Sequence, residues 1–394
     1  MQYEFSDKVK NMKPSAIREI FKSLSDPQMI SLAAGNPAAA SFPVKELAAL
    51  SADIFEKTPI DALQYSITEG YPKLREAVSK RMKEKFNIGR DFDGTVITTG
   101  GQQGVDLTSR ALLNEGDVVV CEQPSFIGSL NNFRSYNTRI VGVERKENGV
   151  DPAELERVFK TEKPKLFYVI PTFHNPLGTT LPLENRKQIY ALCKKYNVMI
   201  YEDNPYGELR FAGEDIPTLK SFDEDGIVIY CSSFSKILSA GMRVGYVIAP
   251  QEVLQKMVVA KQVTDVHTNI FFQMLCYRYM TEYDLDAHIA DIRELYAHKC
   301  GLMLSKMDEV MPDCVSFTRP QGGLFVWATL PEKIDMPAFV KKAIENKVAV
   351  VPGTAFNCDE SAPSDSFRLN YSTPTDEQIV KGVEILGKTV REML

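Results

Sequence analysis

The chain has 394 residues, of which 44% are hydrophobic and 25% are charged, and its formal net charge is −6. A chain of this length exceeds the usual size of one hydrophobic core, so we expect two domains. The lack of a basic excess argues against nucleic acid as a partner. No run of 18 apolar residues occurs, so the sequence predicts no membrane span.

Residues 1–45 are predicted to form an arm. The segment PSAIREIFKSL has a helical pattern, and the stretch SLAAGNPAAASFP that follows it is rich in Gly, Pro and Ala. An arm without its own core must pack on another surface, and we expect it to lie against the small domain and the site. The start lacks the apolar run of a secretory signal. The seven cysteines show no C-x-x-C spacing, so we expect buried thiols in a cytoplasmic protein, without a metal site.

Residues 46–285 are predicted to form the large domain, which is of the α/β class. Seven apolar runs alternate mostly with helical patterns, and this predicts β-α units in a mostly parallel, seven-stranded sheet. The runs are TVITT, DVVVCE, TRIVGVE, KLFYVIP, VMIYED, IVIYCS and RVGYVIA. A ligand is expected where the carboxyl ends of such strands meet.

Residues 286–394 are predicted to form a smaller α+β domain. Helical patterns come first, and the apolar runs QGGLFVWATL and FRLNYS then alternate with helical segments. Arg368 is a charge on the otherwise apolar second run. An inward-pointing arginine of this kind usually meets a carboxylate.

The stretch SSFSKILSAGMRVGY follows the strand pattern IVIYCS and carries Lys236. Ser233 and Ser235 supply hydroxyl donors and Arg243 supplies a fork-shaped charge, so together they are suited to hold a phosphate. Pyridoxal phosphate (PLP) needs a reactive amine beside a phosphate site, because its aldehyde forms a Schiff base with lysine while its phosphate is anchored separately. The alternative for this string alone is a surface lysine in a serine-rich loop.

Three further strings follow predicted strands. TTGGQQGVDL opens a helix with a Gly-rich turn whose free amides favour an anion, FHNPLG places Asn175 before a proline, and YEDNPYG places Asp203 at a strand end. A carboxylate there suits a protonated pyridine nitrogen, which makes the ring an electron sink. The alternatives are a plain helix-entry turn, an Asn-Pro turn and an Asp that caps a turn.

Taken together, these motifs resemble the class I/II aminotransferases of PLP fold type I, from about residue 15 to residue 372. The subgroup that the chain resembles includes 2-aminoadipate, kynurenine and aromatic aminotransferases. The resemblance implies PLP as the cofactor and a homodimer with shared active sites. One departure is that many relatives have a serine where Gly101 stands, which leaves the backbone amides and Gln102 to hold the phosphate.

The resemblance also implies a role for each matching residue. The catalytic residues are Lys236, which carries PLP, Asp203, which faces the pyridine nitrogen, and Tyr206, which faces the phenolic oxygen. The other cofactor contacts are Gly101, Gln102, Ser233, Ser235, Arg243, Asn175, the stacking residue Phe126, and Tyr65, which reaches the phosphate of the neighbouring subunit. The substrate contacts are Arg368, Gly35, Asn175 and Arg18. The ordinary alternatives are a core residue for Phe126, a linker residue for Tyr65 and a solvated helix charge for Arg18.

The resemblance implies a transaminase that exchanges the amino group between an L-amino acid and a 2-oxo acid such as 2-oxoglutarate. We expect an aromatic amino acid, 2-aminoadipate or a similar amino acid as the donor. Lyases and ring-forming synthases of the same fold remain alternatives, because they use the same residues. A PLP-binding regulator is a weaker alternative, since no helix-turn-helix segment precedes the arm. A nicotinamide dehydrogenase is disfavoured, since G-x-G-x-x-G does not follow the first strand.

Overall fold

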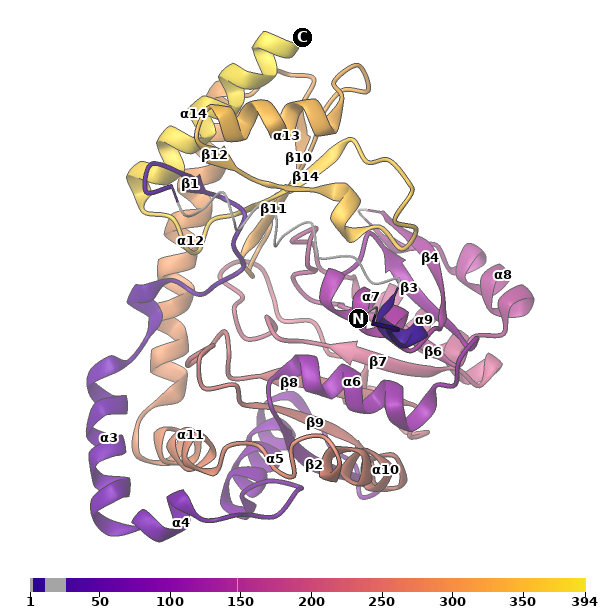
Figure 1. Ribbon diagram of the computed structural model, residues 1–394, viewed down its shortest axis with the longest axis vertical. Helices are drawn as coiled ribbons and strands as arrows, with labels where there is room; N and C mark the ends of the chain where they lie inside the picture. The colour runs from indigo at the N-terminus through magenta and orange to yellow at the C-terminus, as the bar shows by residue number, and fades with distance from the viewer. Residues whose placement is uncertain (1–2, 11–25, 147) are drawn as a thin grey trace.

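The computed structural model describes residues 3–10, 26–146 and 148–394. Its centre is an eight-stranded sheet with the order β2-β9-β8-β7-β6-β3-β4-β5 (Figure 1). The strands are β2 (Asp93–Thr98), β3 (Val118–Gln123), β4 (Arg139–Lys146), β5 (Gly149–Val150), β6 (Leu166–Val169), β7 (Met199–Asp203), β8 (Val228–Ser233) and β9 (Gly245–Pro250). All seven predicted strands are present, and the two-residue β5 adds an eighth.

The strands from β4 through β3, β6 and β7 to β8 run parallel, whereas β9 is antiparallel to both of its neighbours. Strands β3, β6 and β8 are buried on both faces because helices cover both faces. One apolar cluster joins the sheet to α6 (Gly101–Leu112), α7 (Ile127–Ser135) and α10 (Gln251–Gln262). Another joins the opposite face to α8 (Pro152–Glu162) and α9 (Leu183–Tyr196). The predicted α/β layering is confirmed.

The C-terminal part contains a four-stranded antiparallel sheet with the order β10-β11-β14-β13. The strands are β10 (Ser316–Phe317), β11 (Phe325–Thr329), β13 (Val351–Pro352) and β14 (Ser366–Asn370). In a separate pair, β1 (Ile30–Ser31) of the arm runs parallel to β12 (Val348–Ala349). The arm therefore packs on the C-terminal part through residues 30–34, as its apolar residues require.

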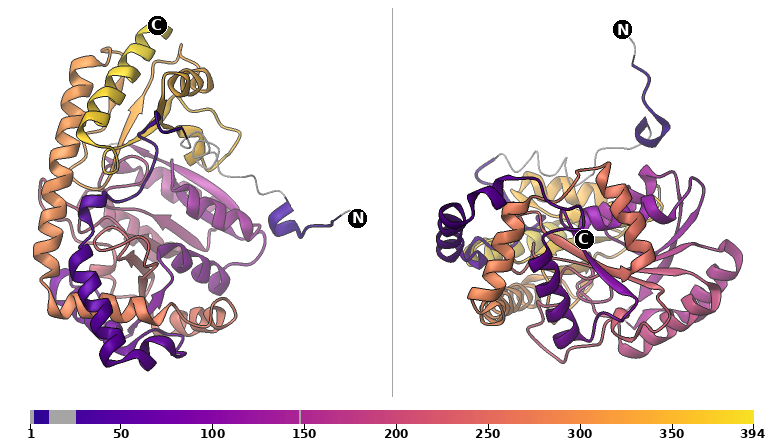
Figure 2. Two further views of the ribbon diagram at one scale, coloured as in Figure 1. Left: turned by 60° about the vertical axis from the view of Figure 1, so that its left-hand side comes forward. Right: turned by 90° about the horizontal axis from the view of Figure 1, so that it is seen from below.

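The described residues contain further helices, most of which pack around these sheets, whereas α1 (Asp7–Lys10) projects away from them (Figure 2). The others are α3 (Val44–Lys57), α4 (Pro59–Leu63), α5 (Pro72–Phe86), α11 (Ile270–Glu282), α12 (Leu285–Val310), α13 (Met336–Glu345) and α14 (Asp376–Met393), with the 3-10 turns η1 (Ala39–Ser41), η2 (Lys220–Phe222) and η3 (Gly353–Phe356). Figure 2 shows α12 running along one side of the molecule from the large sheet's helices up to α14. The start of α12 coincides with the predicted domain boundary at residues 285 and 286, and the division into arm, large and small domains stays a prediction.

Two further expectations concern the cysteines and membrane-spanning helices. Five cysteines are buried, but Cys314 is exposed and Cys358 is half-buried, so the prediction of buried thiols was wrong for Cys314. Its position in the loop after α12 explains the exposure. Among the helices of the described residues, none is long and apolar enough to cross a membrane.

Candidate functional site

A cavity of about 420 Å³ lies where the carboxyl ends of the parallel strands face the small sheet. Twelve of the predicted site residues line it: Gly35, Gly101, Gln102, Phe126, Asn175, Asp203, Tyr206, Ser233, Ser235, Lys236, Arg243 and Arg368. They come from the arm, from the start of α6, from the ends of β7 and β8, from the turns that follow β3, β6, β7 and β8, from the loop before β9, and from β14. The sheet topology thus brings together residues that lie far apart in the sequence.

Lys236 follows the end of β8 and points into this cavity. Its Nζ donates a hydrogen bond to the carbonyl oxygen of Gly35 at 2.8 Å. Burial lowers the pKa of Lys236 from 10.5 to about 8, and the nearby charges of Arg368 and Arg243 add to this effect. A lysine in such surroundings is neutral far more often than a solvated one, and is therefore a better nucleophile and base.

The Gly-rich turn before α6 forms the rim of the cavity next to Arg243. Gly100 has φ +76°, and a Cβ there would lie 2.3 Å from Arg243 Nη2. Only glycine permits this approach. Arg243 donates through Nη2 to the carbonyl oxygen of Thr99 at 3.4 Å. The guanidinium is therefore held beside the N-terminus of α6, where an anion is stabilised.

The hydroxyls on the other side of this rim are also ordered. Ser233 Oγ donates to Ser235 Oγ at 2.7 Å and accepts from the amide of Ser235 at 3.0 Å. By contrast, the side-chain amide of Gln102 donates to the carbonyl oxygen of Gly128 at 3.0 Å. The rim thus offers backbone amides, hydroxyls and Arg243 to an anion, while one N–H of the Gln102 amide is engaged with Gly128.

Asp203, the last residue of β7, lies on the floor of the cavity. Tyr168 on β6 donates its hydroxyl to Asp203 Oδ2 at 2.6 Å. Burial raises the pKa of Asp203 to about 6, and the hydrogen bond from Tyr168 opposes this rise. The sequence analysis did not identify Tyr168, because a tyrosine within an apolar strand has the pattern of a core residue.

Arg368 is almost completely buried, and Asn175 holds it. Its Nη1 donates to Asn175 Oδ1 at 2.8 Å and its Nη2 to the carbonyl oxygen of Ala33 at 2.8 Å. The guanidinium also lies over the rings of Phe325 and Phe356 at 4.2 and 5.0 Å. No carboxylate among the described residues pairs with it, and its Nε has no hydrogen-bond partner there. A buried guanidinium without a carboxylate is ready for an acidic ligand.

The bond to Arg368 also fixes the orientation of the Asn175 amide. Because Oδ1 accepts from Arg368, the donor Nδ2 faces the hydroxyl of Tyr206, at 3.5 Å. Burial raises the pKa of Tyr206, so its hydroxyl stays protonated. Asn175 and Tyr206 therefore present two donors side by side at the cavity wall.

The charges that line the cavity favour anions. Its lining contains the three cations Lys236, Arg243 and Arg368 and a single carboxylate, Asp203. Arg368 is buried, so its attraction for a carboxylate is screened less than at the surface, whereas Arg243 is exposed at the rim.

Two predicted residues lie elsewhere. Tyr65 is 81% exposed, and its ring meets that of His267 edge-on at 5.8 Å, outside the cavity of its own chain. Arg18 lies outside the described residues.

The chain matches the family model described as aminotransferase class I and II over residues 27–386. The chain belongs to this family. It is 39% identical to an aromatic-amino-acid aminotransferase of Thermococcus litoralis, over 100% of this chain and 95% of that protein. The solved structure of a multiple substrate aminotransferase from Thermococcus profundus has a TM-score of 0.95 at 36% identity, covering 99% of this chain and 98% of that chain.

A third relative contains a derivative of the cofactor. The structure of an alpha-aminoadipate aminotransferase from Thermus thermophilus, in complex with N-(5'-phosphopyridoxyl)-L-leucine, has a TM-score of 0.91 at 36% identity and covers 99% of this chain and 97% of that chain. The predicted family, fold, enzyme class and cofactor are confirmed. The protein is a PLP-dependent aminotransferase that acts on amino acids and 2-oxo acids.

The residues of the cavity fit this cofactor. An anion site, a lysine of lowered pKa and a buried carboxylate lie around one cavity, as a phosphate, an aldehyde and a pyridine nitrogen require. The family model and these three relatives, all named aminotransferases, favour a transaminase over the alternatives of a lyase, a regulator and a dehydrogenase.

Proposed function

We propose that this aminotransferase exchanges the amino group between an aromatic or acidic L-amino acid, such as 2-aminoadipate, and a 2-oxo acid such as 2-oxoglutarate. We further propose that Lys236 carries the cofactor. The observation that carries the substrate proposal is the buried Arg368, whose charge has no carboxylate partner among the described residues. The α-carboxylate of either substrate supplies that partner.

Each group at the site then has a task. Arg368 holds the α-carboxylate beside Gly35, and Asn175 fixes the guanidinium in that position. Arg243, Ser233 and Ser235, with the amides at the start of α6, hold the phosphate. Phe126 lies in the cavity lining, where its ring would pack against the cofactor plane.

The chemistry depends on Asp203, on the donors Tyr206 and Asn175, and on Lys236. When bound, PLP supplies an aldehyde that takes the substrate amine and a ring that withdraws electrons from the substrate Cα. Asp203 keeps its carboxylate against the ring nitrogen, and Tyr206 and Asn175 donate to the phenolic oxygen. Lys236 takes the proton from the substrate Cα and returns it in the exchange, for which its lowered pKa suits it.

The kind of substrate side chain is inferred from the cavity lining and from the similar proteins. The described cavity lining includes Phe325 and Ala33, which contact Arg368, and Ile170, and these residues suit an apolar or aromatic side chain. The similar proteins are named for aromatic amino acids, multiple substrates and alpha-aminoadipate. We propose that Arg18 supplies the charge for an acidic side chain, so that Arg18→Ala raises KM for glutamate and 2-aminoadipate and spares aromatic donors.

We also propose a homodimer with shared sites. Ile60, Leu63, Tyr65 and Ile67 are all exposed, by 47% to 81%, on and after α4. An apolar patch of this kind is typical of an interface. Tyr65 would then reach the cofactor phosphate of the partner subunit.

The substrate assignment is tested with a panel of L-amino acids. Each is mixed with the holoenzyme, and conversion of the bound cofactor to its amine form is followed by absorbance, with 2-oxoglutarate then added. We expect fast conversion by aromatic donors, 2-aminoadipate and glutamate, and slow conversion by small apolar ones. A preference for alanine or glycine would contradict the proposal.

The attachment residue is tested separately. Borohydride reduction followed by peptide mapping should find the cofactor on the peptide that contains Lys236. A label on another lysine would overturn the assignment of Lys236.

A further inference from the structure

The hydrogen bond from Tyr168 to Asp203 has no role in the function proposed above. Tyr168 lies on β6, its side chain is completely buried, and its hydroxyl donates to Asp203 Oδ2 at 2.6 Å. This is the one side-chain hydrogen bond that the Asp203 carboxylate makes within the part of the chain that the structure describes. Since Tyr168 engages Oδ2, Oδ1 is left for a ligand in the cavity that Asp203 lines.

Neighbouring rings hold Tyr168 in place. Its ring stacks on Tyr201 at a centroid distance of 5.8 Å and an angle of 23°, and it meets Phe133 edge-on at 5.6 Å. Tyr168 and Tyr201 are register partners on adjacent strands, and Asp203 lies two residues beyond Tyr201 on the same face. The phenol therefore reaches along the sheet to the carboxylate from a fixed position.

The titratable groups around Asp203 are phenols and one thiol, and within the described residues only Tyr168 donates a hydrogen bond to its carboxylate. They are Tyr168 on β6, Tyr201 on β7, Tyr206 in the turn after β7 and Cys231 on β8. The pKa of each is raised, first of all by burial, so none carries a charge near neutral pH. Within the described ranges, no lysine, arginine or histidine forms an ion pair with Asp203.

The absence of a cation has a chemical consequence. A cation would hold the carboxylate ionised, but it would also neutralise the negative charge that the ring nitrogen needs as its counterion. A phenol donates a hydrogen bond without adding a charge, so it favours the ionised carboxylate and leaves that charge for the nitrogen.

We propose that Tyr168 is a positioning residue that orients the Asp203 carboxylate towards the ring nitrogen of the cofactor and keeps it ionised. The proposal rests on the role given above to Asp203. It adds that Tyr168 acts only through Asp203 and has no contact with the substrate.

The effect on Asp203 is measured without reference to activity. In the full chain labelled with ¹³C at aspartate carboxyls, the Asp203 signal is assigned by its loss in Asp203→Asn and titrated before PLP is added. Tyr168→Phe should raise the pKa of Asp203 above its value of about 6, because the hydrogen bond that lowers it is gone. An unchanged pKa would overturn the proposal.

Tyr201→Phe is the matched control. The Tyr201 hydroxyl is buried, has no hydrogen-bond partner in the described chain, and lies beside the Cys231 thiol. The substitution keeps the ring that packs on Tyr168 and removes only the hydroxyl. The titration of Asp203 and the activity should both be unchanged.

The holoenzyme supplies a second measurement. Tyr168→Phe should lower kcat by about 10- to 100-fold, the loss expected for one hydrogen bond to a charged group, while KM changes little. The loss of kcat should be larger at pH 6 than at pH 8.5, because the raised pKa of Asp203 moves the acid limb of the pH profile of kcat to higher pH. An equal loss at every pH, or a rise in KM alone, would mean that Tyr168 does not act on the ionisation of Asp203.

A double variant separates this proposal from the role of Asp203. If Tyr168 acts through Asp203, adding Tyr168→Phe to Asp203→Asn should cause no further loss of kcat. Full additivity of the two losses would overturn the proposal for Tyr168. An Asp203→Asn variant with unchanged kcat would instead contradict the role of Asp203 itself.

Discussion

At the scale of single residues, the site depends on buried charges that lack the usual counterions. Arg368 and Lys236 are held by carbonyl and amide oxygens, and no carboxylate among the described residues forms an ion pair with either. Burial lowers the pKa of both, and the like charges of Arg368 and Arg243 lower the pKa of Lys236 further. This arrangement costs stability, and such costs are typical of functional sites.

The pKa of Lys236 gives a prediction for cofactor attachment. With a pKa of about 8, roughly a tenth of Lys236 is neutral at pH 7, against less than a thousandth for a lysine at 10.5. In the cofactor-free protein, the rate of attachment followed by absorbance should therefore rise up to about pH 8 and then level off.

Arg368→Leu should move this midpoint to higher pH, because Arg368 is the charged neighbour with the largest effect on Lys236. The control Arg157→Leu removes an exposed charge that pairs with Glu154 on α8 and should leave the midpoint in place. A midpoint near pH 10 in the unsubstituted protein would show that Lys236 is solvated.

The sequence was informative where a residue's position in a strand determines its role. Lys236, Asp203 and Asn175 follow apolar runs, and the carboxyl ends of parallel strands must meet, so their convergence could be predicted. Tyr168 could not be found in this way, because its contact depends on the register of β6 against β7. The lack of a carboxylate partner for Arg368 could not be predicted either. It depends on the packing of β14 against Asn175 and Ala33, which sequence spacing does not specify.

At the scale of elements, the turn between β2 and α6 determines the place of Arg243. Gly100 and Gly116 both have positive φ, at +76° and +80°, but a Cβ would meet Arg243 only at Gly100, while nothing lies within 4 Å at Gly116. Each alanine strains the backbone by about 1 to 3 kcal/mol. The two substitutions therefore separate backbone strain from displacement of the guanidinium.

Gly100→Ala should weaken PLP binding by about tenfold or more, since Arg243 must leave its place and one charged hydrogen bond is lost. Gly116→Ala should bind PLP normally and lose a similar amount of stability. Titration with PLP and urea unfolding measure the two effects. Equal PLP affinities in both variants would mean that Arg243 does not hold the phosphate.

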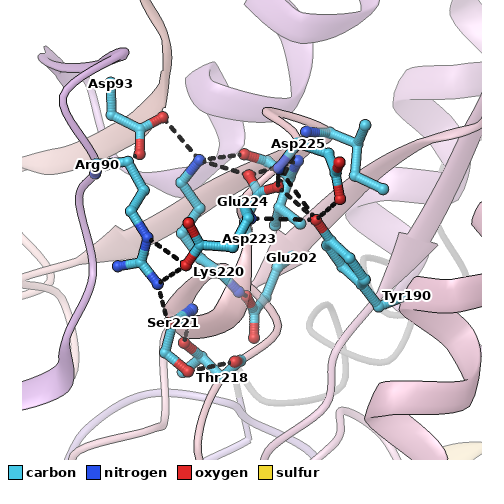
Figure 3. A network of polar contacts seen from close by, with 12 residues as sticks. Arg90, Asp93, Tyr190, Glu202, Thr218, Lys220, Ser221, Asp223, Glu224 and Asp225 are labelled. Atoms are coloured by element: carbon cyan, nitrogen blue, oxygen red, sulfur yellow. Dashed lines mark hydrogen bonds and ion pairs between the residues drawn. The ribbon is translucent and has the colours of Figure 1, made fainter. Parts of the chain in front are cut away.

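A polar network joins η2 to the starts of β2 and β8 and to Glu202 of β7, and so stabilises the sheet (Figure 3). The buried Lys220 of η2 donates to Asp93 at 2.7 Å, to Asp223 at 2.9 Å and to the carbonyl oxygen of Val228 at 2.9 Å. It thus connects η2 with the starts of β2 and β8. Glu202 of β7 accepts from the backbone amides of Leu219 and Lys220, which fixes η2 to the sheet.

Lys220→Met should lower the free energy of unfolding by about 3 to 5 kcal/mol, because two buried carboxylates lose their cation. The kcat of the folded enzyme should not change, since the network lies at the other end of β8 from Lys236. Lys187→Met removes an exposed pair with Glu184 and should have little effect. Urea unfolding with activity assays checks both, and a loss for Lys220→Met as small as the control's would contradict the structural role.

At the scale of the whole molecule, the cavity is built from three parts of the chain. Gly35 comes from the arm, Lys236 from the large sheet and Arg368 from the small sheet, so a relative movement of these parts changes the spacing of the groups that hold the substrate. Tyr65 is the predicted site residue that faces outward, and a second copy of the chain would give it a role.

Mixing two inactive variants tests the shared site. Lys236→Ala removes the attachment residue, and Tyr65→Phe removes the hydroxyl proposed to reach the partner's phosphate. In a hybrid dimer, the Tyr65→Phe chain supplies Lys236 and the Lys236→Ala chain supplies Tyr65 to the same site, so this site is intact. When the two variants are unfolded together and refolded, we expect up to about a quarter of the unsubstituted activity, because half of the dimers are hybrids with one intact site each. Separately refolded variants provide the baseline. Activity that stays at this baseline, although size measurements show hybrids, would mean that each chain completes its own site.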